Sequence, residues 1–320
     1  MRLRKILAIA VVLCFTLAGA ANAADFPNRT IRLIVPFAAG GATDLMARVL
    51  TPAMSGELGN IDIIVENRGG GGGAIAMMEL IQSPPDGYTL ILASTAAAVV
   101  TPIISDVGYS KADLIPIVQL AELPTNIFVL ADSEIQSMED LMRLGQENFG
   151  RLTFSTSGTG SLHHIVAELF QHTAGKQGLL THVPYNSGTE SITAVLGGHV
   201  HMAFANASYG ESYVNQQGIM RVIATSSEYG CPVVEGVPTF RSLGYDVTIA
   251  NWWGLFARTG TSEEILDIVA EAVRNAMADP EVYQAMVNLG MLPDYMGRAD
   301  FTAKYLAQYD QLAEVLADLF

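Results

Sequence analysis

The stretch from Val35 to Leu50, VPFAAGGATDLMARVL, combines a strand end, a two-glycine turn and a helix start. Gly40 and Gly41 permit backbone angles closed to other residues, and apolar side chains recur after them at helical spacing. Backbone amides at a helix N-terminus have no partner inside the helix and carry roughly half a positive charge. Such a turn can hold a carboxylate or a phosphate without any lysine or arginine. The alternative is a structural turn whose glycines only allow close packing.

A second stretch, LTFSTSGTGSLHHIVAELF from Leu152 to Phe170, repeats this order of strand, turn and helix. Its turn consists of serine, threonine and glycine, whose hydroxyls and amides also suit an anion. If the two helix N-termini face each other, a dicarboxylate can be held at both ends. Ser94 and Thr95 end another predicted strand, where ligands bind in open α/β sheets, or they cap the helix that follows.

Other chemistries find less support. The run Gly69 to Gly73 lacks the Lys-Ser/Thr ending of a phosphate-binding loop and the acidic residue of a dinucleotide site, which argues against nucleotides. All six histidines fall between His163 and His201, but none of their spacings matches a metal motif, so we expect no metal and no cofactor. No motif places a base beside Ser157 or Ser161, so a hydrolase is disfavoured and we expect a binding protein rather than an enzyme.

Apolar runs alternate with helical patterns along almost the whole chain, which is typical of α/β layering around a mostly parallel sheet. The segment from Pro102 to Pro116 is predicted to be irregular. Thr261 and Glu264 predict a capping box for the first of the C-terminal helices. Strands are predicted at residues 31–35, 61–65, 127–130 and 222–225, with two more that end at Thr95 and Asn206.

The first residues have the pattern of a secretory signal peptide. Three cations precede the apolar run 6–17, which is too short to span a bilayer, and residues 21–23 form a small-residue cleavage site. We therefore expect residues 1–24 to be removed on export. The net charge of the full chain is −15, and loss of these cations makes the exported chain more acidic still. Such a chain is a poor candidate for binding nucleic acid or an anionic membrane surface.

Taken together, six segments resemble the extracytoplasmic solute receptors of tripartite tricarboxylate transporters, also called Bug receptors. They follow one another along nearly the whole exported chain: VPFAAGGATD, ENRGGGGG, PPDGYTLIL, the SGTGS turn with His164 and Glu168, HVPYNSGTESITAVLGGHV and WWGLFARTGT. The resemblance implies an α/β fold of the periplasmic-binding-protein type II, a Venus flytrap of two domains with a cleft between them. It implies a domain 1 of residues 25–125 and 250–320 and a domain 2 of residues 126–249, with two crossings between them.

The resemblance also implies a small organic carboxylate as ligand, either a di- or tricarboxylate or an aromatic acid. The receptor is expected to be periplasmic and monomeric, to close over its ligand and to deliver it to the membrane subunits of a tripartite tricarboxylate transporter. The alternative is a receptor that presents its ligand-bound state to a signalling partner. Carried over by motif, the ligand-binding residues are Phe37, Ala39, Gly40, Gly41, Thr43, Asp44 and Ser94 of domain 1 and Ser157, Gly158, Thr159, Ser161 and Asn206 of domain 2.

Two positions depart from the family pattern. Many relatives have proline at the position of Ala38 and an acidic residue at the position of Ala205. The missing acid argues against an amino acid with its ammonium group as the ligand. Asp44 would repel a carboxylate, so we expect its side chain to cap its own helix. The sequence leaves open whether the pocket includes the aromatic residues Trp252, Trp253 and Tyr209.

Overall fold

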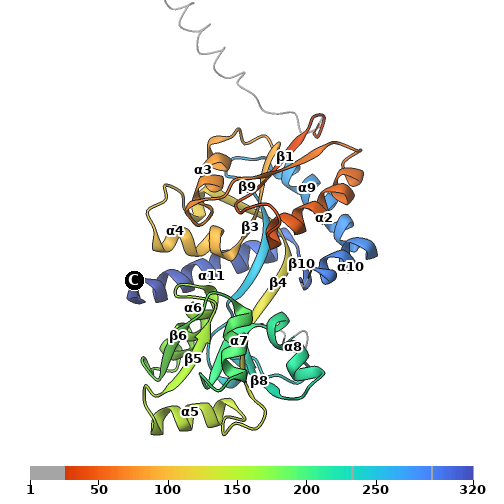
Figure 1. Ribbon diagram of the computed structural model, residues 1–320. Coiled ribbons are helices and arrows are strands. Elements are labelled where there is room, and N and C mark those ends of the chain that lie inside the picture. Colours follow the sequence, from red (N-terminus) through yellow and green to blue (C-terminus); the bar gives the residue numbers. More distant parts are fainter. Residues whose placement is uncertain (1–25, 229, 232–233, 290, 320) are drawn as a thin grey trace, which may run out of the picture.

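The computed structural model describes residues 26–228, 230–231, 234–289 and 291–319, so the predicted signal peptide at residues 1–24 lies outside the described residues. The described chain forms two α/β lobes that are connected by long strands (Figure 1). The strands are β1 (Ile31–Val35), β2 (Ile63–Asn67), β3 (Thr89–Ser94), β4 (Leu114–Leu130), β5 (Leu152–Thr156), β6 (Leu180–Pro184), β7 (Met202–Asn206), β8 (Met220–Thr225), β9 (Ala250–Arg258) and β10 (Pro293–Met296). The α-helices are α2 (Ala42–Glu57), α3 (Ala74–Gln82), α4 (Thr101–Ile104), α5 (Met138–Glu147), α6 (Leu162–Thr173), α7 (Gly188–Leu196), α8 (Ala207–Asn215), α9 (Glu263–Ala278), α10 (Pro280–Asn288) and α11 (Arg298–Leu319).

The strands of the described residues join into one sheet in the order β2-β1-β3-β9-β4-β7-β5-β6, and β8 and β10 pair additionally with β4. β1 runs parallel to β2 and β3, and β5 runs parallel to β6 and β7. Parallel neighbours need a crossover connection, which α2, α3, α6 and α7 provide. β4 and β9 run antiparallel to the strands beside them. The parallel parts therefore lie at the two ends of the sheet, one in each lobe.

β4 passes from one lobe to the other. Its residues 114–124 pair with β9, and its residues 125–129 pair with β7. Pro124 lies opposite Ala250, the first residue of β9, so the two chain segments that connect the lobes lie side by side. We call the part with β1–β3, β9, β10 and α2–α4 the first lobe, and the part with β5–β8 and α5–α8 the second lobe. α11 packs against β4 and also reaches α6 of the second lobe.

Helices cover both faces of the first lobe's sheet. Ile31, Leu33 and Val35 pack in one buried cluster with residues of α2 and α9, whereas Ile34 belongs to another cluster with α3. A strand that is covered on both faces has a continuous apolar sequence, as β1 does. Trp252 and Trp253 are adjacent in β9 and belong to different clusters. Trp252 packs in the cluster of Ile34, and Trp253 packs in the other cluster. The two indole side chains therefore lie on opposite faces of the sheet.

The largest difference from the sequence-based prediction concerns β4. This strand begins at Leu114, inside the segment predicted to be irregular, and not at Ile127. Pro116 lies where the register with β9 shifts, and Pro124 lies where β4 changes its partner strand. Proline is tolerated at such interruptions because no ladder hydrogen bond depends on its missing N–H. The two prolines therefore do not end the strand. They lie at a shift of register and at a change of partner strand within β4.

Two predicted boundaries are shifted. β2 begins at Ile63, two residues later than predicted. The N-cap of α9 is Ser262, which accepts a hydrogen bond from Ile265 N–H, so the predicted capping box at Thr261 is wrong by one residue. The Thr261 hydroxyl instead donates to Arg258 O at 2.9 Å. No helix in the described ranges combines the length and the apolar character that a membrane span requires.

Candidate functional site

A cavity of about 500 Å³ lies between the two lobes. Of the predicted ligand-binding residues, Phe37, Gly41, Thr43, Ser94 and Ser157 line it. None of the described side chains in its lining is a lysine, arginine, aspartate or glutamate, so an anion would be bound by dipoles and hydrogen-bond donors. The other residues of the lining are Ala38, Ala42, Ala96, Leu162, His163, Asn251 and Trp253.

The first wall of the cavity is the N-terminal turn of α2. Gly40 has a φ of +81°, a left-handed conformation that favours glycine, and Gly41 is the N-cap. The first hydrogen bond of the helix runs from Leu45 N–H to Gly41 O at 2.9 Å. The amides of Ala42 and Thr43 therefore have no acceptor within the helix, and both residues line the cavity. These amides and the dipole of a 16-residue helix together attract an anion.

Asp44 stabilises this turn without lining the cavity. Its buried carboxylate accepts hydrogen bonds from Gly40 N–H at 2.8 Å and from Asn67 Nδ2 at 3.0 Å, and it pairs with Arg48. The Arg48 guanidinium, aided by these two donors, lowers the pKa of the Asp44 carboxyl in spite of its burial. The prediction that Asp44 caps its own helix is therefore wrong, because α2 has no side-chain cap and Asp44 binds the amide of Gly40, before the N-cap residue Gly41. The negative charge that would repel a carboxylate is neutralised behind the wall.

Trp253 belongs to the same wall. Its Nε1–H donates a hydrogen bond of 2.9 Å to Thr43 Oγ1, and the register of β3 and β9 places it opposite Ser94. Trp252 points to the other face of the sheet, where it is fully buried and donates to Gln308 Oε1. Tyr209 is not among the residues that line the cavity and packs against Gly188. Of the three aromatic residues that the sequence left open, Trp253 therefore lines the cavity.

The second wall is the turn before α6. Ser157 Oγ lies 2.8 Å from His163 Nδ1, and His163 Nε2 lies 2.9 Å from Asn206 Oδ1. Burial lowers the pKa of His163, so its imidazole is neutral near pH 7. Leu162 and His163 are the first two residues of α6, and the N-cap before them is Ser161. The N-termini of α2 and α6 therefore face one cavity. This is the condition under which a dicarboxylate can be held at both ends.

The remaining predicted residues are not among those that line the cavity. Gly158 and Gly160 have positive φ angles that shape the turn, and the Ser161 hydroxyl accepts from His164 N–H at 3.3 Å. Asn206 ends β7 and contacts the cavity only through His163. The predicted residues outside the lining are Ala39, Gly40, Asp44, Gly158, Thr159, Ser161 and Asn206, and a direct contact of these residues with the ligand stays a prediction.

Two lining residues with polar side-chain atoms, His163 and Asn251, were not predicted, and a third, Trp253, was left open. Asn251 and Trp253 are two residues apart in β9, so their side chains share one face of the sheet. The sequence contains that spacing, but it does not indicate that β9 pairs with β3 beside the cavity. His163 could have been found from its position in the first turn of a helix whose N-terminus was predicted to bind.

Two further histidines stack beside the second wall. The rings of His164 and His182 are 4.0 Å apart, and Gly160 N–H donates to His164 Nδ1 at 3.1 Å. Burial, followed by the nearby His164, lowers the pKa of His182 to about 4. Within the described residues, no three side chains of histidine, cysteine, aspartate or glutamate gather closely enough to hold a metal ion.

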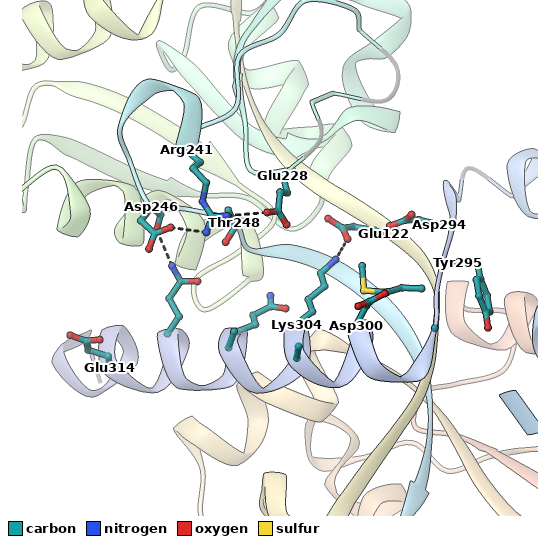
Figure 2. A pocket seen from close by; sticks show the side chains of 16 residues that line it. Glu122, Glu228, Arg241, Asp246, Thr248, Asp294, Tyr295, Asp300, Lys304 and Glu314 are labelled. Atoms are coloured by element: carbon teal, nitrogen blue, oxygen red, sulfur yellow. Dashed lines mark hydrogen bonds and ion pairs between the residues drawn. The ribbon is translucent and has the colours of Figure 1, made fainter. Parts of the chain in front are cut away.

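A larger cavity of about 870 Å³ lies along α11 (Figure 2). Six carboxylates line it, and its two cations are already paired, Lys304 with Glu122 and Arg241 with Glu228 and Asp246. The field of this cavity is negative and repels an organic acid. The smaller, uncharged cavity between the helix N-termini is therefore the candidate site for an anion.

Ser157, His163 and Asn206 have the order of a hydrolase triad, but they do not form one. In a triad, a carboxylate stabilises the imidazolium that forms when the serine is deprotonated. Asn206 has no charge, and the lowered pKa of His163 opposes protonation of its ring. The arrangement can position the Ser157 hydroxyl but lacks the group that would activate it.

Comparisons with known proteins agree with a binding role. The chain matches the tripartite tricarboxylate transporter family receptor over residues 46–315. It is 33% identical over 302 residues to a UPF0065 protein in the gbd 5′ region of Cupriavidus necator, which covers 92% of this chain and 90% of that protein. A solved structure of a TctC solute binding protein from Polaromonas, without ligand, matches with a TM-score of 0.86 at 27% identity over 92% of this chain and 99% of that one.

A second solved structure contains an organic acid. MatC from Rhodopseudomonas palustris with bound malate matches with a TM-score of 0.65 at 25% identity, over 91% of this chain and 98% of that one. These matches confirm the two-domain fold of periplasmic solute-binding proteins. The matched family consists of substrate-binding receptors and not of enzymes, as the sequence predicted. The chain belongs to the receptors of the tripartite tricarboxylate transporter family.

Proposed function

We propose that this chain is a periplasmic receptor that captures a small organic carboxylate and delivers it to the membrane subunits of a tripartite tricarboxylate transporter. The observation that carries the proposal is that the N-termini of α2 and α6 face one cavity with no charged side chain in its described lining. Such a cavity offers free amides and positive dipole ends to an anion, without a counter-ion of its own. The malate in the structure of MatC supports the same class of ligand.

We further propose that the ligand is held by hinge closure of two domains. Domain 1 comprises residues 25–125 and 250–320, and domain 2 comprises residues 126–249. Support comes from β4, whose partner changes from β9 to β7 between Pro124 and Thr125, and from the pairing of Pro124 with Ala250. Ligand affinity for the closed arrangement would shift the equilibrium towards it.

In this proposal the receptor acts as a monomer in the periplasm. The signal-peptide pattern at residues 1–24 supports the location. A receptor whose two lobes must close and then meet a membrane protein has to keep both lobes accessible. Light scattering of the exported chain, with and without ligand, tests the monomer, and a mass that doubles in either state would contradict it.

The function is tested by a thermal-shift screen of the exported chain against dicarboxylates, tricarboxylates and aromatic acids. A ligand at a concentration of 100 times its Kd stabilises the native state by about 2.7 kcal/mol, which is a readily detected shift in Tm. A hit is then supplied to proteoliposomes that contain the membrane subunits. Uptake that depends on the receptor is the expected result. If no organic acid shifts Tm, carboxylate capture is wrong; if an acid binds but no uptake follows, delivery to this transporter is wrong.

A further inference from the structure

The hydroxyl of Ser157 belongs to a chain of hydrogen bonds that leads away from the cavity. Its Oγ lies 2.8 Å from Nδ1 of His163, whose Nε2 lies 2.9 Å from Asn206 Oδ1. Ser157 and His163 line the cavity, whereas Asn206 is buried at the end of β7. We call these three residues the relay. Each ring nitrogen of His163 has one partner in the relay, so the proton positions of its members depend on one another.

Asn206 sets the direction of the relay. An amide oxygen only accepts hydrogen bonds, so His163 Nε2 carries the ring proton and donates it to Asn206 Oδ1. The buried imidazole is neutral and has a single N–H, so its Nδ1 is an acceptor. Ser157 therefore donates its hydroxyl proton to Nδ1. What Ser157 presents to the cavity is the lone pairs of its oxygen, which accept a hydrogen bond but cannot donate one.

The wall formed by α2 offers hydrogen-bond donors. Trp253 Nε1–H donates to Thr43 Oγ1, so the hydroxyl proton of Thr43 is free to be donated into the cavity. The amides of Ala42 and Thr43 are donors as well, because neither has an acceptor within α2. A carboxylate oxygen only accepts, so it fits these donors and the free amides at the N-terminus of α6, but it is disfavoured at Ser157 Oγ itself. A ligand that satisfies both walls needs a carboxylate for α2 and a hydrogen-bond donor for Ser157.

We propose that the relay makes this receptor selective for hydroxycarboxylates, in which a hydroxyl group donates to Ser157 Oγ while a carboxylate binds at the N-terminus of α2. The inference rests on the proposed function as a carboxylate receptor and names the class of acid. An ammonium group would be a donor too, but no carboxylate lies in the described lining of the cavity to balance its charge. His163 is a positioning residue in this account, because it acts through the orientation of the Ser157 hydroxyl.

The test uses pairs of acids that differ by one hydroxyl group: malate and succinate, 2-hydroxyglutarate and glutarate, citrate and tricarballylate. Each acid, with both enantiomers where they exist, is titrated calorimetrically into the exported chain. In the pair that binds most tightly, the hydroxy acid is expected to bind about 10-fold or more tightly than its partner, because Ser157 would otherwise be left unpaired. Equal affinities within every pair overturn the inference and leave carboxylate binding intact. Binding of none of these acids also overturns the inference, whereas carboxylate capture is then decided by the aromatic acids of the thermal-shift screen.

Variants separate the relay from the general shape of the cavity. In Ser157→Ala the ratio of affinities within the pair is expected to fall to about one. In His163→Leu the Ser157 hydroxyl becomes free to donate, so the acid without the hydroxyl group is expected to gain affinity. The matched comparison is Ser94→Ala, which removes a hydroxyl from the same cavity outside the relay and is expected to keep the ratio. A ratio that survives in Ser157→Ala overturns the inference.

A direct measurement of the proton position does not depend on any substitution. Long-range ¹H–¹⁵N spectra distinguish the two tautomers of a neutral histidine. His163 is expected to have a protonated Nε2 and an unprotonated Nδ1 in the protein without ligand. The opposite tautomer would make Ser157 a donor towards the cavity and would overturn the inference, even if His163→Leu does not fold.

Discussion

Trp253 Nε1 donates a hydrogen bond of 2.9 Å to Thr43 Oγ1, which joins β9 to the first turn of α2 across 210 residues of sequence. This bond fixes the indole in the wall of the cavity and leaves the Thr43 hydroxyl proton for a ligand. Trp252, next in the chain, faces the opposite side of the sheet and donates to Gln308. The two neighbours therefore differ in role, one at the site and one in the core.

Trp253→Phe is expected to weaken carboxylate binding about fivefold, since a neutral hydrogen bond contributes about 1 kcal/mol. The matched variant Trp252→Phe is expected to leave affinity unchanged and to lower the free energy of unfolding by about 1–3 kcal/mol, because it leaves the Gln308 oxygen buried and unpaired. Calorimetry and urea denaturation of both variants provide the comparison. If Trp252→Phe loses affinity and Trp253→Phe does not, the assignment of Trp253 to the site and of Trp252 to the core is wrong.

Gly41→Val is expected to abolish carboxylate binding while the protein still folds. The φ of −77° at Gly41 is open to any residue, and a Cβ there would lie 3.3 Å from Ala38 O, which requires only a small adjustment. The branched side chain would then occupy the approach to the Ala42 and Thr43 amides. Gly56→Ala at the exposed far end of the same helix is the control, and its added Cβ meets no atom within 4 Å. Undiminished binding in Gly41→Val would place the site elsewhere.

Asp44→Ala is expected to weaken both stability and ligand binding, because Gly40 N–H and the Asn67 amide lose a buried acceptor. The cost to the free energy of unfolding should be about 1–3 kcal/mol. Arg48→Met keeps both of these hydrogen bonds but leaves the Asp44 charge without its cation, so it should cost less stability than Asp44→Ala and weaken carboxylate binding by charge repulsion. If the two variants lower the free energy of unfolding equally, the ion pair and not the bond to Gly40 holds the turn.

Stability is expected to fall as the pH drops from about 6.5 to about 4, because of His182. Its pKa is lowered to about 4 in the folded protein by burial and by His164, whereas an unfolded histidine takes up its proton near pH 6.5. Between these values the unfolded chain binds more protons, so the contribution is complete above pH 6.5 and is lost on acidification.

His182→Phe is the variant that tests this pH dependence, since it keeps an aromatic ring in the stack with His164 and Phe154 but cannot titrate. The urea midpoint of the wild type should drop between pH 7 and pH 5 by more than that of the variant. The exposed His199, replaced by glutamine, is the control and should behave as the wild type. An equal drop in wild type and His182→Phe would exclude His182 as the cause.

The sequence predicted the units that form locally. The strand, turn and helix from Ile31 to Glu57 depend on neighbours in the chain, as does the turn before α6, so their glycines, caps and apolar spacing were sufficient. β4 was underestimated because Pro116 and Pro124 resemble strand breakers, and only its long-range partners β9 and β7 reveal where a proline is tolerated.

The lining of the cavity was predicted in part for the same reason. Gly41, Thr43 and Ser157 belong to local turns, and each lies in the lining. Trp253 enters the cavity because β9 pairs with β3 and lies opposite Ser94, a contact across 159 residues that no local pattern indicates. His163 was counted with the other histidines, and only the packing of α6 against β7 brings it to Asn206.

A crystal structure of the exported chain with the acid that binds most tightly tests the central claim most directly. A carboxylate of the ligand is expected within hydrogen-bond distance of the Ala42 and Thr43 amides, with Ser157 contacting the same molecule from the other lobe. A ligand bound in the acidic cavity along α11, or one that contacts neither helix N-terminus, would contradict the account.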